Sequence, residues 1–516
     1  MVGAALWWAA LPPLELGPLA WIAPVSWLLL VRRNELAGKR PYRALWLAGF
    51  LLCLANFHWL RFPHWATIGV WIGVTAVGGS HLPVFVWLGR VAVHRLRVPL
   101  CIVAPVTLVA IELLAQLAMP GSMMCSLAHT QYRWITLIQA SDLAGAYGIS
   151  FLVMFVAACL ARMIPLDGRP ATAWPLLPAL AVMGGALLYG HVRTSGPPAP
   201  CVARVAIVQG RVDVPSKSDP AKQPMILQDY LARSRAARAE WGPLDCILWP
   251  ETSFGWDLVT YDRDVPSADV PDGAKQQWDA ADQKCRAMLA SVAREIDAPL
   301  LTGIARRHHT GTHMSEFNAA VLVAPDGELL GRYDKIFLVM FGEHVPLGET
   351  FPWLNGLIPG SLGRTAGTTP LAFRLGPLRI APNICYECAL GEELRWQVNA
   401  LAAAGDEPDV LVNLSNVNWF RGSTELEMHL ACGVFRAVEL RKPMLMAVNA
   451  GISASIDGNG RIRAQAARFA DDAILAEVCL DHRGSLFRRY GNWLADGCVL
   501  ACVAIGVLGC RRKRCG

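Results

Sequence analysis

The sequence carries little charge for its length. Only 17% of its 516 residues are charged, against roughly 25% in a typical soluble domain, and 54% are hydrophobic. The shortage lies in residues 1–192, which hold nearly all the long apolar runs, whereas residues 200–485 resemble an ordinary globular domain. A short apolar run at 493–510 closes the chain. We therefore expect a membrane domain, a large soluble insert and one last span.

Basic stripes with interleaved aromatic residues are also missing. The net charge of +6 suits a membrane protein with basic loops, and without such a stripe it gives no support to nucleic-acid binding. We expect no nucleic acid among the partners.

The fifteen cysteines have no regular spacing, which argues against a disulfide framework. Many lie in apolar stretches, where a reduced cysteine packs as a small hydrophobe. Those in apolar stretches are Cys53, Cys101, Cys125, Cys159, Cys498 and Cys502, and those in the soluble part are Cys201, Cys246, Cys285, Cys385, Cys388, Cys432 and Cys479. Cys385 and Cys388 form a CxxC pair, which is compatible with a metal half-site or a redox pair. Because no second CxxC and no nearby histidine pair completes a zinc site, we expect neither a metal nor another cofactor.

Apolar runs predict eight membrane spans, since a span needs about 20 apolar residues. They lie near 1–13, 17–31, 42–60, 67–89, 98–118, 145–164, 173–191 and 491–510. The first is short and contains Pro12 and Pro13; a cleaved signal peptide is the alternative there, although no charged segment precedes it.

Clusters of basic residues set the orientation of these spans. They follow the second, fourth, sixth and last spans, at 32–43, 90–97, 162–169 and 511–514. With eight spans, all four clusters fall on one side, which the positive-inside rule makes cytoplasmic. Residues 192–490 are then expected on the opposite face. One carboxylate, Glu112, lies inside the fifth apolar run, where it is either functional or paired within the helix bundle.

The soluble part alternates short apolar runs with helical stretches, which predicts an α/β layered sheet. Expected strands are 204–208, 246–249, 299–303, 319–323, 380–384, 410–414 and 444–448, and expected helices are 223–240, 274–296 and 424–441. The pair Asp326-Gly327 and the segment 456–462 predict hairpin turns.

Three segments carry residues suited to chemistry. Glu251 follows an apolar strand in CILWPETSF, Lys335 and Glu343 lie in GRYDKIFLVMFGEHVPLGE, and Cys385 ends another strand in RIAPNICYECALGEE. Charged and nucleophilic residues at strand ends are where α/β folds place active sites. Each residue alone has an ordinary structural explanation, such as a loop start, a surface lysine or a core thiol.

Together these segments resemble the nitrilase superfamily, whose members use a Glu-Lys-Cys triad in this chain order. The motifs WPE, YDK, FGEHVPLGE, ICYE and LVNLSNVNWF are similar to its apolipoprotein N-acyltransferase branch, as are AHTQYRW, IQASDLAGAYGISF and the single closing span. The resemblance implies transmembrane helices over 1–192, an αββα sandwich catalytic domain over 193–488, and a last helix with a basic tail over 489–516. Two departures from the branch are Met340, where a proline is common, and SNVNWFR at 415–421, where an aspartate is replaced by Val417 or Asn418.

The same resemblance implies a ping-pong acyl transfer through a thioester. Cys385 is the expected nucleophile, Glu251 moves its proton, and Lys335 holds the oxyanion together with a backbone N–H after the cysteine. The expected supporting residues are Glu343, Glu387, Tyr386 and Asn318. The implied donor is the sn-1 chain of a phospholipid such as phosphatidylethanolamine, and the implied acceptor is the α-amino group of a diacylglyceryl-cysteine apolipoprotein. The place of action would be the periplasmic face of a bacterial inner membrane.

An unbroken apolar run after Lys335 supports a lipid substrate independently. It contains Phe337, Met340 and Phe341, and it is either a lipid-facing lid or a buried strand. Trp419 and Phe420 either line the same cavity or pack in the core. The alternative functions are a membrane-tethered amidase acting on a small C–N substrate, which has no use for the many spans, and a silent scaffold or lipid-binding protein, which has no use for an intact triad.

Overall fold

The computed structural model describes residues 1–196, 200–217, 219–262, 264, 270, 273–311, 313–345, 348, 350–351, 353 and 363–511. The chain divides into two compact units. The membrane unit comprises Met1–Pro197, Glu427–Arg441 and Arg483–Gly516, and the α/β unit comprises Pro198–Leu426 and Lys442–His482. Residues 427–441, which we expected inside the catalytic domain, thus group with the apolar helices.

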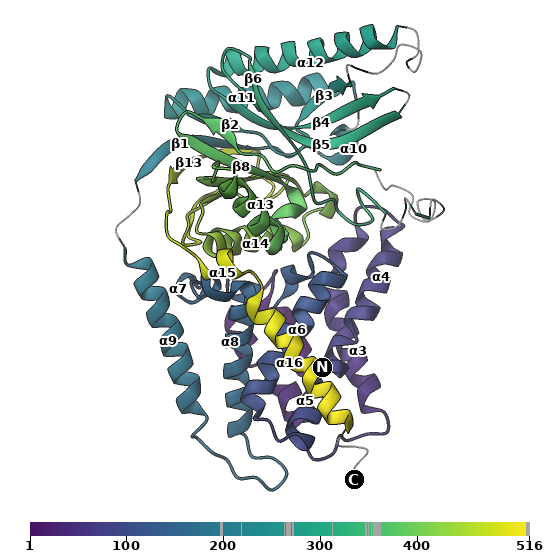
Figure 1. Cartoon of the computed structure of the whole chain (residues 1–516), viewed down its shortest axis with the longest axis vertical. Coiled ribbons are helices and arrows are strands. Elements are labelled where there is room, and N and C mark those ends of the chain that lie inside the picture. Colours follow the sequence, from purple (N-terminus) through teal and green to yellow (C-terminus); the bar gives the residue numbers. More distant parts are fainter. Residues whose placement is uncertain are drawn as a thin grey trace. The chain divides into compact units, whose positions relative to one another are not determined.

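The membrane unit is helical (Figure 1). Its helices are α1 (Val2–Ala10), α2 (Val25–Arg32), α3 (Pro41–Asn56), α4 (Thr67–Gly78), α5 (His81–Arg90), α6 (Leu100–Ala118), α7 (Ile135–Ile138), α8 (Ser141–Met163), α9 (Leu176–Thr194), α15 (Leu486–Tyr490), α16 (Trp493–Arg511) and most of α14 (Glu425–Leu440). Among the described residues, five helical stretches are long and apolar enough to cross a membrane: Thr67–Arg95, Leu100–Ala118, Ser141–Met163, Leu176–Thr194 and Trp493–Arg511. The other three expected spans form shorter helices, so the count of eight crossings stays a prediction.

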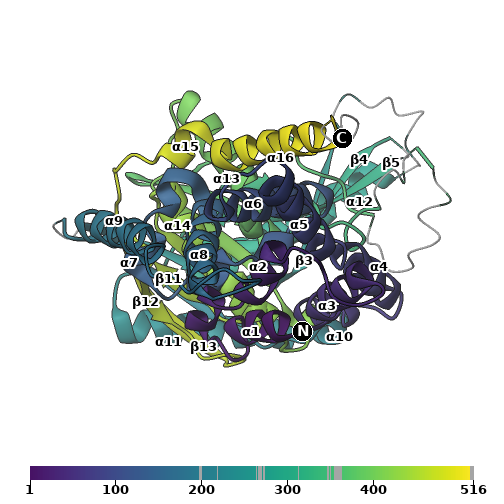
Figure 2. The same cartoon turned by 90° about the horizontal axis from the view of Figure 1, so that it is seen from below.

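Helices α6 and α8 form the centre of the membrane unit, and α9 lies at its edge (Figure 2). Of the most apolar stretch of α8, 67% is buried by protein, against 11% for α9. Glu112 of α6 lies in this centre, where its carboxylate accepts hydrogen bonds from the backbone N–H of Leu127 (3.2 Å) and the hydroxyl of Ser150 (3.1 Å). This arrangement favours a paired structural carboxylate over a functional one.

Ion pairs explain why residues 427–441 belong to the membrane unit. Arg441 is fully buried and pairs with the carboxylate of Asp142 at the start of α8. Glu439 accepts a hydrogen bond from the backbone N–H of Ala146 at 2.7 Å, just after Gly145 interrupts the helical conformation. Because a buried charge needs a partner, these contacts tie α14 to α8.

The α/β unit contains two sheets. The strands are β1 (Cys201–Gln209), β2 (Cys246–Leu248), β3 (Phe254–Tyr261), β4 (Leu300–Thr310), β5 (His313–Val323), β6 (Leu329–Asp334), β7 (Phe373–Leu375), β8 (Leu378–Ile384), β9 (Val410–Asn416), β10 (Met444–Asn449), β11 (Ala454–Ile456), β12 (Ile462–Gln465) and β13 (Asp472–Cys479). The first sheet has the order β13-β1-β2-β4-β5-β6, with β3 also paired to β4, and the second has the order β12-β11-β10-β9-β8-β7. Strands β1, β2 and β4 are parallel, as are β8, β9 and β10.

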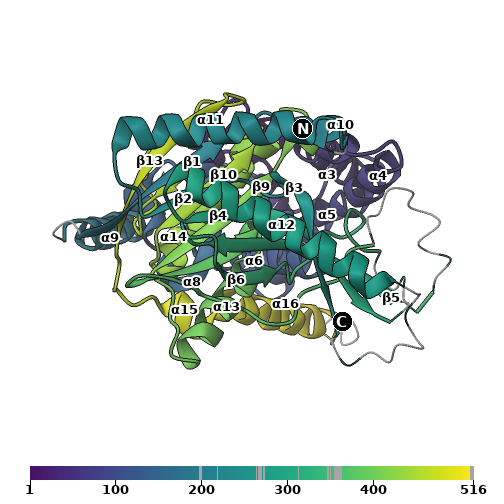
Figure 3. The ribbon, with the colours of Figure 1, turned by 90° about the horizontal axis from the view of Figure 1, so that it is seen from above.

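The two sheets pack face to face through an aliphatic core. Its members include Val205, Ile207, Leu248 and Leu301 of the first sheet and Ile384, Val412, Leu414 and Leu445 of the second. Helices α11 (Gln223–Trp241) and α12 (Ala274–Ile296) cover the outer face of the first sheet (Figure 3). Helix α13 (Gly391–Ala403) lies against the second, where Gln397 donates to the carbonyl of Pro382 at 2.7 Å. The layers confirm the expected nitrilase-like sandwich.

All seven strands and all three helices expected from the sequence are present, and both predicted hairpins join antiparallel strands. Strands β3, β7 and β13 and helices α10 (Val214–Lys217) and α13 were not foreseen, and strands β6, β11 and β12 were implied only by the two predicted hairpin turns.

The expectation that the cysteines form no disulfide is wrong, because Cys201 and Cys479 are joined. These residues are 278 positions apart in the sequence and lie opposite one another on the antiparallel pair β1 and β13. Spacing along the chain could not reveal a pair that strand register creates.

Candidate active site

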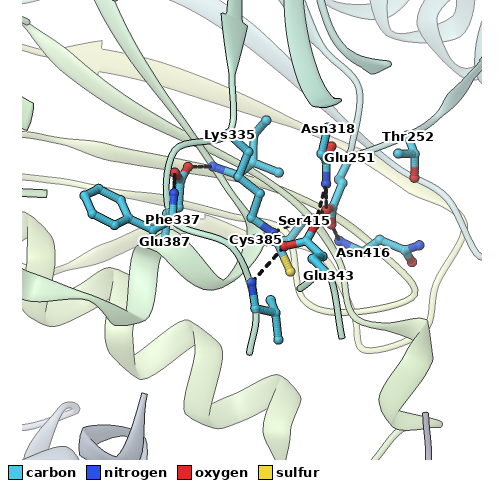
Figure 4. Close-up of polar contacts among 12 residues, drawn as sticks. Glu251, Thr252, Asn318, Lys335, Phe337, Glu343, Cys385, Glu387, Ser415 and Asn416 are labelled. Atoms are coloured by element: carbon cyan, nitrogen blue, oxygen red, sulfur yellow. Dashed lines mark hydrogen bonds and ion pairs between the residues drawn. The ribbon is translucent and has the colours of Figure 1, made fainter. Parts of the chain in front are cut away.

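The three expected triad residues come from strand ends at one edge of the sheets. Glu251 follows β2 and Lys335 directly follows β6, which runs in the same direction as β2 because β4, β5 and β6 alternate. Cys385 directly follows β8 in the second sheet. Figure 4 shows the thiol of Cys385, the ammonium of Lys335 and the carboxylates of Glu251 and Glu343 gathered together. The structure therefore brings the predicted residues into one site.

Glu251 is buried on a turn whose backbone is tightly enclosed. Trp249 anchors the preceding strand by donating from its indole N–H to the hydroxyl of Ser234 at 2.9 Å. Thr252 has a φ of +47°, a left-handed conformation that a threonine rarely adopts. On β4, a Cβ at Gly303 would lie 2.5 Å from the Glu251 Cα, so only glycine leaves room for this turn.

Two hydrogen bonds hold the carboxylate of Glu251. The side-chain amide of Asn318 on β5 donates to its Oε1 at 2.6 Å, and the backbone N–H of Asn416 donates to its Oε2 at 2.8 Å. Asn318 also donates to Glu343 at 3.2 Å, so one amide bridges both carboxylates. This geometry supports the expected supporting position of Asn318.

Lys335 is almost fully buried between two carboxylates. Its Nζ lies 2.7 Å from Oε2 of Glu343 and 4.0 Å from Oε1 of Glu251. Burial alone would lower the pKa of Lys335, but the two carboxylates outweigh it and raise that pKa above its ordinary value. Burial likewise opposes ionisation of Glu343, yet the lysine and the N–H of Val339 (2.9 Å) lower the pKa of Glu343. Lys335 therefore keeps its positive charge.

Cys385 is half-buried at the start of a 3-10 turn (Cys385–Ala389), with a φ of +54°. Its backbone carbonyl accepts a hydrogen bond from Asn413 at 3.1 Å. Burial raises the pKa of its thiol well above the ordinary value; Glu251 raises it further, and Lys335 lowers it. A thiol in this setting needs a base to remove its proton as it attacks.

Glu387 is buried and organises the loop after Lys335 rather than facing the cluster. Its carboxylate accepts from the hydroxyl of Tyr333 (2.9 Å) and from the backbone N–H groups of Ile336 (2.9 Å), Phe337 (3.0 Å) and Ile384 (2.6 Å). It therefore joins the loop that carries Lys335 to the strand end that carries the cysteine. Tyr386, which lies between Cys385 and Glu387 in the sequence, is half-buried, and burial raises the pKa of its phenol.

The apolar run after Lys335 forms a half-buried loop, so the alternative of a buried strand is wrong. Phe337 meets Trp396 of α13 edge to face, with ring centroids 5.9 Å apart, and Trp396 is 43% exposed. Met340 and His344 form an isolated bridge, and Phe341 has a φ of +65°. A loop with large, partly exposed apolar side chains beside the cluster is compatible with a lipid-facing surface.

Trp419 and Phe420 lie on a short 3-10 turn (Asn418–Phe420) and are not core residues, since Trp419 is 37% exposed and Phe420 is half-buried. The departure at 417–418 is accommodated locally. Val417 is buried, while the Asn418 side chain donates to the carbonyl of Val212 at 3.1 Å. Asn418 thus ties this loop, which lacks the aspartate, to the segment after β1.

Three polar residues of the site were missed from the sequence. The backbone of Asn416 and the amide of Asn413 contact the site from β9, and Lys217 contacts the backbone of Glu251 from the segment after β1. Asparagines in an apolar strand were a usable signal, because LVNLSN places buried amides where a strand ends. Within the described residues, no group of three or more His, Cys, Asp or Glu side chains could hold a metal ion.

Comparison with known sequences defines the class of protein. The profile of the carbon–nitrogen hydrolase family matches residues 204–486, and the profile of the apolipoprotein N-acyltransferase N-terminal domain matches residues 3–159. The α/β unit with its Glu-Lys-Cys cluster is thus a carbon–nitrogen hydrolase domain in a membrane protein.

Relatives that match nearly the whole chain narrow the assignment from this class to one family. The chain is 31% identical to the apolipoprotein N-acyltransferase of Geobacter metallireducens, covering 97% of this chain and 93% of that one. It is 29% identical to the protein of the same name from Rhodopirellula baltica, covering 99% and 97%. The chain belongs to the apolipoprotein N-acyltransferase family and is an acyltransferase.

Two solved structures resemble part of the chain. One is a carbon–nitrogen hydrolase superfamily protein of Xanthomonas campestris, with 18% identity, a TM-score of 0.36, and coverage of 54% of this chain and 90% of that one. Another is an amidase of Nesterenkonia, with 17% identity, a TM-score of 0.37, and coverage of 59% and 99%.

Proposed function

We propose that the chain N-acylates the diacylglyceryl-cysteine of apolipoproteins in two half-reactions, with Cys385 as the acyl carrier. The observation that carries the proposal is the buried cluster itself. A thiol with a raised pKa, a carboxylate fixed by two hydrogen bonds and a lysine that keeps its charge are the three groups that acyl transfer needs.

In the first half-reaction, Glu251 takes the proton of Cys385 as the sulfur attacks an ester carbonyl of the lipid donor. The ammonium of Lys335 stabilises the developing oxyanion, together with a backbone N–H after the cysteine. When the C–O bond breaks, Glu251 returns the proton to the leaving alcohol. The products are an acyl-thioester on Cys385 and a lysophospholipid.

In the second half-reaction, the α-amino group of the acceptor attacks the thioester. Glu251 removes a proton from that nitrogen, an amide bond forms, and the proton returns to the departing Cys385 sulfur. Glu343 keeps Lys335 charged and in place throughout, since it forms the shorter of the two ion pairs. The enzyme ends each cycle in its starting protonation state.

The proposed donor is a bilayer phospholipid, with phosphatidylethanolamine as the implied headgroup. The lipid-facing residues would be Phe337, Met340 and Phe341 on the loop after Lys335, with Trp419 and Phe420 on the turn after β9. Partly exposed aromatic side chains are common where a protein meets lipid headgroups. A membrane enzyme with such a loop can take an acyl chain directly from the bilayer.

The proposed place of action is the periplasmic face of a bacterial inner membrane, with residues 193–488 as the catalytic domain and 1–192 and 489–516 as its membrane anchors. The basic clusters support this orientation through the positive-inside rule. The disulfide between Cys201 and Cys479 supports it independently, because disulfides persist in oxidising compartments such as the periplasm.

The test is to incubate the purified chain with phosphatidylethanolamine labelled in its sn-1 acyl chain and to look for an acyl mass shift on the peptide containing Cys385. Adding a diacylglyceryl lipopeptide should discharge the label onto its N-terminus. Cys385→Ala should abolish both steps, whereas Cys388→Ala should retain substantial transfer. Label transfer by Cys385→Ala would refute the assignment. Release of ammonia from small amides without lipopeptide acylation would support the less favoured amidase alternative.

A further inference from the structure

Lys217 lies in the short helix α10 (Val214–Lys217), in the segment between β1 and α11. Its backbone is fixed at both ends. The N–H donates to the carbonyl of Asp213 at 3.0 Å, and the carbonyl accepts from the side chain of Gln223 at 2.5 Å. The Gln223 side chain itself packs on Gly255 of β3, where an added Cβ would lie 1.8 Å from its Oε1. The position of Lys217 is therefore set by the fold.

The ammonium of Lys217 contacts the turn that carries the catalytic carboxylate. Its Nζ donates to the main-chain carbonyl of Glu251 at 2.9 Å and lies 3.5 Å from the hydroxyl of Thr252. Gly303 of β4 also lies against this turn, because an added Cβ there would come within 2.5 Å of the Thr252 backbone nitrogen. The left-handed Thr252 is thus in close contact with both the glycine and the lysine.

Lys217 also changes the charge balance of the site. Glu251 and Glu343 carry two negative charges, and Lys335 supplies one positive charge. The ammonium of Lys217 supplies a second positive charge, close enough to act on both Glu251 and Cys385. A second cation at the site favours transient negative charge on sulfur and on a substrate oxygen.

The charged and titratable groups that face Lys217 are Glu251 and Cys385 from the strand ends. Asp213 and Lys222 lie on its own segment; there, the Asp213 carboxylate accepts from the N–H of Ser216, and Lys222 donates to the hydroxyl of Ser216. Burial lowers the pKa of Lys217 to about 8, against the opposing effect of Glu251. The ammonium is thus present at neutral pH and is lost in the mildly alkaline range.

We infer that Lys217 is a positioning residue for acyl transfer, which clamps the Glu251–Thr252 turn through the Glu251 carbonyl and supplies the second positive charge of the site. This inference rests on the proposed function, because it takes Glu251 as the base. It also predicts that the alkaline limit of thioester formation reports the ionisation of a lysine outside the triad.

The test compares Lys217→Met, Lys217→Arg and the control Lys222→Met, a change in an exposed lysine on the same segment. The measurement is the rate of thioester formation on Cys385 with phosphatidylethanolamine, from neutral to alkaline pH, alongside the melting temperature. Lys217→Met should lower the maximal rate by about tenfold to a hundredfold, with little change in the apparent KM for lipid. Lys222→Met should match the unmodified chain.

Lys217→Arg should recover much of the rate and lose the alkaline decline centred near pH 8, because a guanidinium stays protonated there. A Lys217→Met chain with unchanged rate and unchanged pH profile would overturn the inference. Equal losses in the Met and Arg variants, with early melting in both, would also overturn it and leave only a packing role. Failure of the proposed function is a separate outcome, because it would appear as label in Cys385→Ala or as no thioester in the unmodified chain.

Discussion

Replacing Glu387 by glutamine tests whether this buried carboxylate holds the loop that carries Lys335. The carboxylate accepts from four donors, three of them backbone N–H groups. A glutamine keeps the shape but turns one acceptor oxygen into a donor. The least costly orientation places its NH2 group toward the N–H of Ile384 and keeps its oxygen toward those of Ile336 and Phe337.

The expected loss of folding stability follows from the hydrogen bonds that the substitution removes. One hydrogen bond to a charged acceptor disappears, worth about 1.5–3 kcal/mol, and the two remaining N–H groups bond to a neutral oxygen instead. Part of this loss of stability is offset. Burial disfavours the charged carboxylate, as the raised pKa of Glu387 indicates, and a neutral glutamine avoids that unfavourable burial of charge. We expect a net loss of about 1–3 kcal/mol, or roughly 3–10 °C in melting temperature for a domain of this size.

The rate of thioester formation should also fall, because the loop held by Glu387 begins at Ile336, next to Lys335, which we propose stabilises the oxyanion. Melting temperature and acylation are measured together for Glu387→Gln, Tyr333→Phe and Glu477→Gln. Tyr333→Phe removes one of the donors and should have a smaller effect, and Glu477, an exposed carboxylate on β13, serves as the matched control. Wild-type stability and rate in Glu387→Gln, or an equal loss in Tyr333→Phe, would refute the reasoning.

Three further predictions follow from the same geometry. Glu343→Gln leaves a buried ammonium without its nearest partner and should cost about 3–5 kcal/mol and most of the activity. Since the pKa of Glu343 is lowered in the folded chain, its stabilisation is complete above the ordinary carboxyl value and is lost as pH falls through the lower folded value. Melting curves of the two chains should therefore converge in acid, and a constant gap would contradict the ion pair. Changing Phe337 and Phe341 together to serine should raise the apparent KM for a phospholipid donor while a water-soluble short-chain thioester still acylates the enzyme. Equal loss with both donors in an early-melting protein would refute a lipid-facing loop. Replacing both Cys201 and Cys479 by serine should lower stability by about 2–5 kcal/mol, as should a reductant, and reductant-insensitive melting would contradict the disulfide.

Local patterns in the sequence were sufficient to predict many of the strands and helices of the α/β unit. Runs such as those ending at Leu248 and Ile384 are apolar enough to be buried on both faces, which parallel strands require. The Asp326-Gly327 turn predicts its hairpin because glycine supplies the positive φ that the turn needs, and Gly327 has a φ of +96°. Strand β13 was missed because its alternating, partly exposed pattern is weak, and its partner β1 lies far away in the chain.

The candidate site, too, was predictable from the sequence only in part. Residue type and a place after an apolar strand made Glu251, Lys335 and Cys385 candidates, and the motifs that resemble the nitrilase superfamily singled them out. Their convergence depends on strand order, since β2, β6 and β8 come from two sheets whose pairing is not written in any local pattern. A partner such as Lys217, which contacts the carbonyl of Glu251, carries no motif of its own.

The sequence by itself determined that this protein has apolar helices and an α/β domain, because these depend on composition and short-range periodicity. It also offered Glu251, Lys335 and Cys385 as candidate catalytic residues, through the family motifs in which they lie. Only the tertiary structure decided that Glu387 holds a loop, that residues 427–441 join the membrane unit, that two distant cysteines meet, and that Lys217 faces the turn of the base. Each of these depends on contacts between residues far apart in the chain. Such contacts are fixed by strand register and by the need of buried charges for partners, and neither can be read one segment at a time.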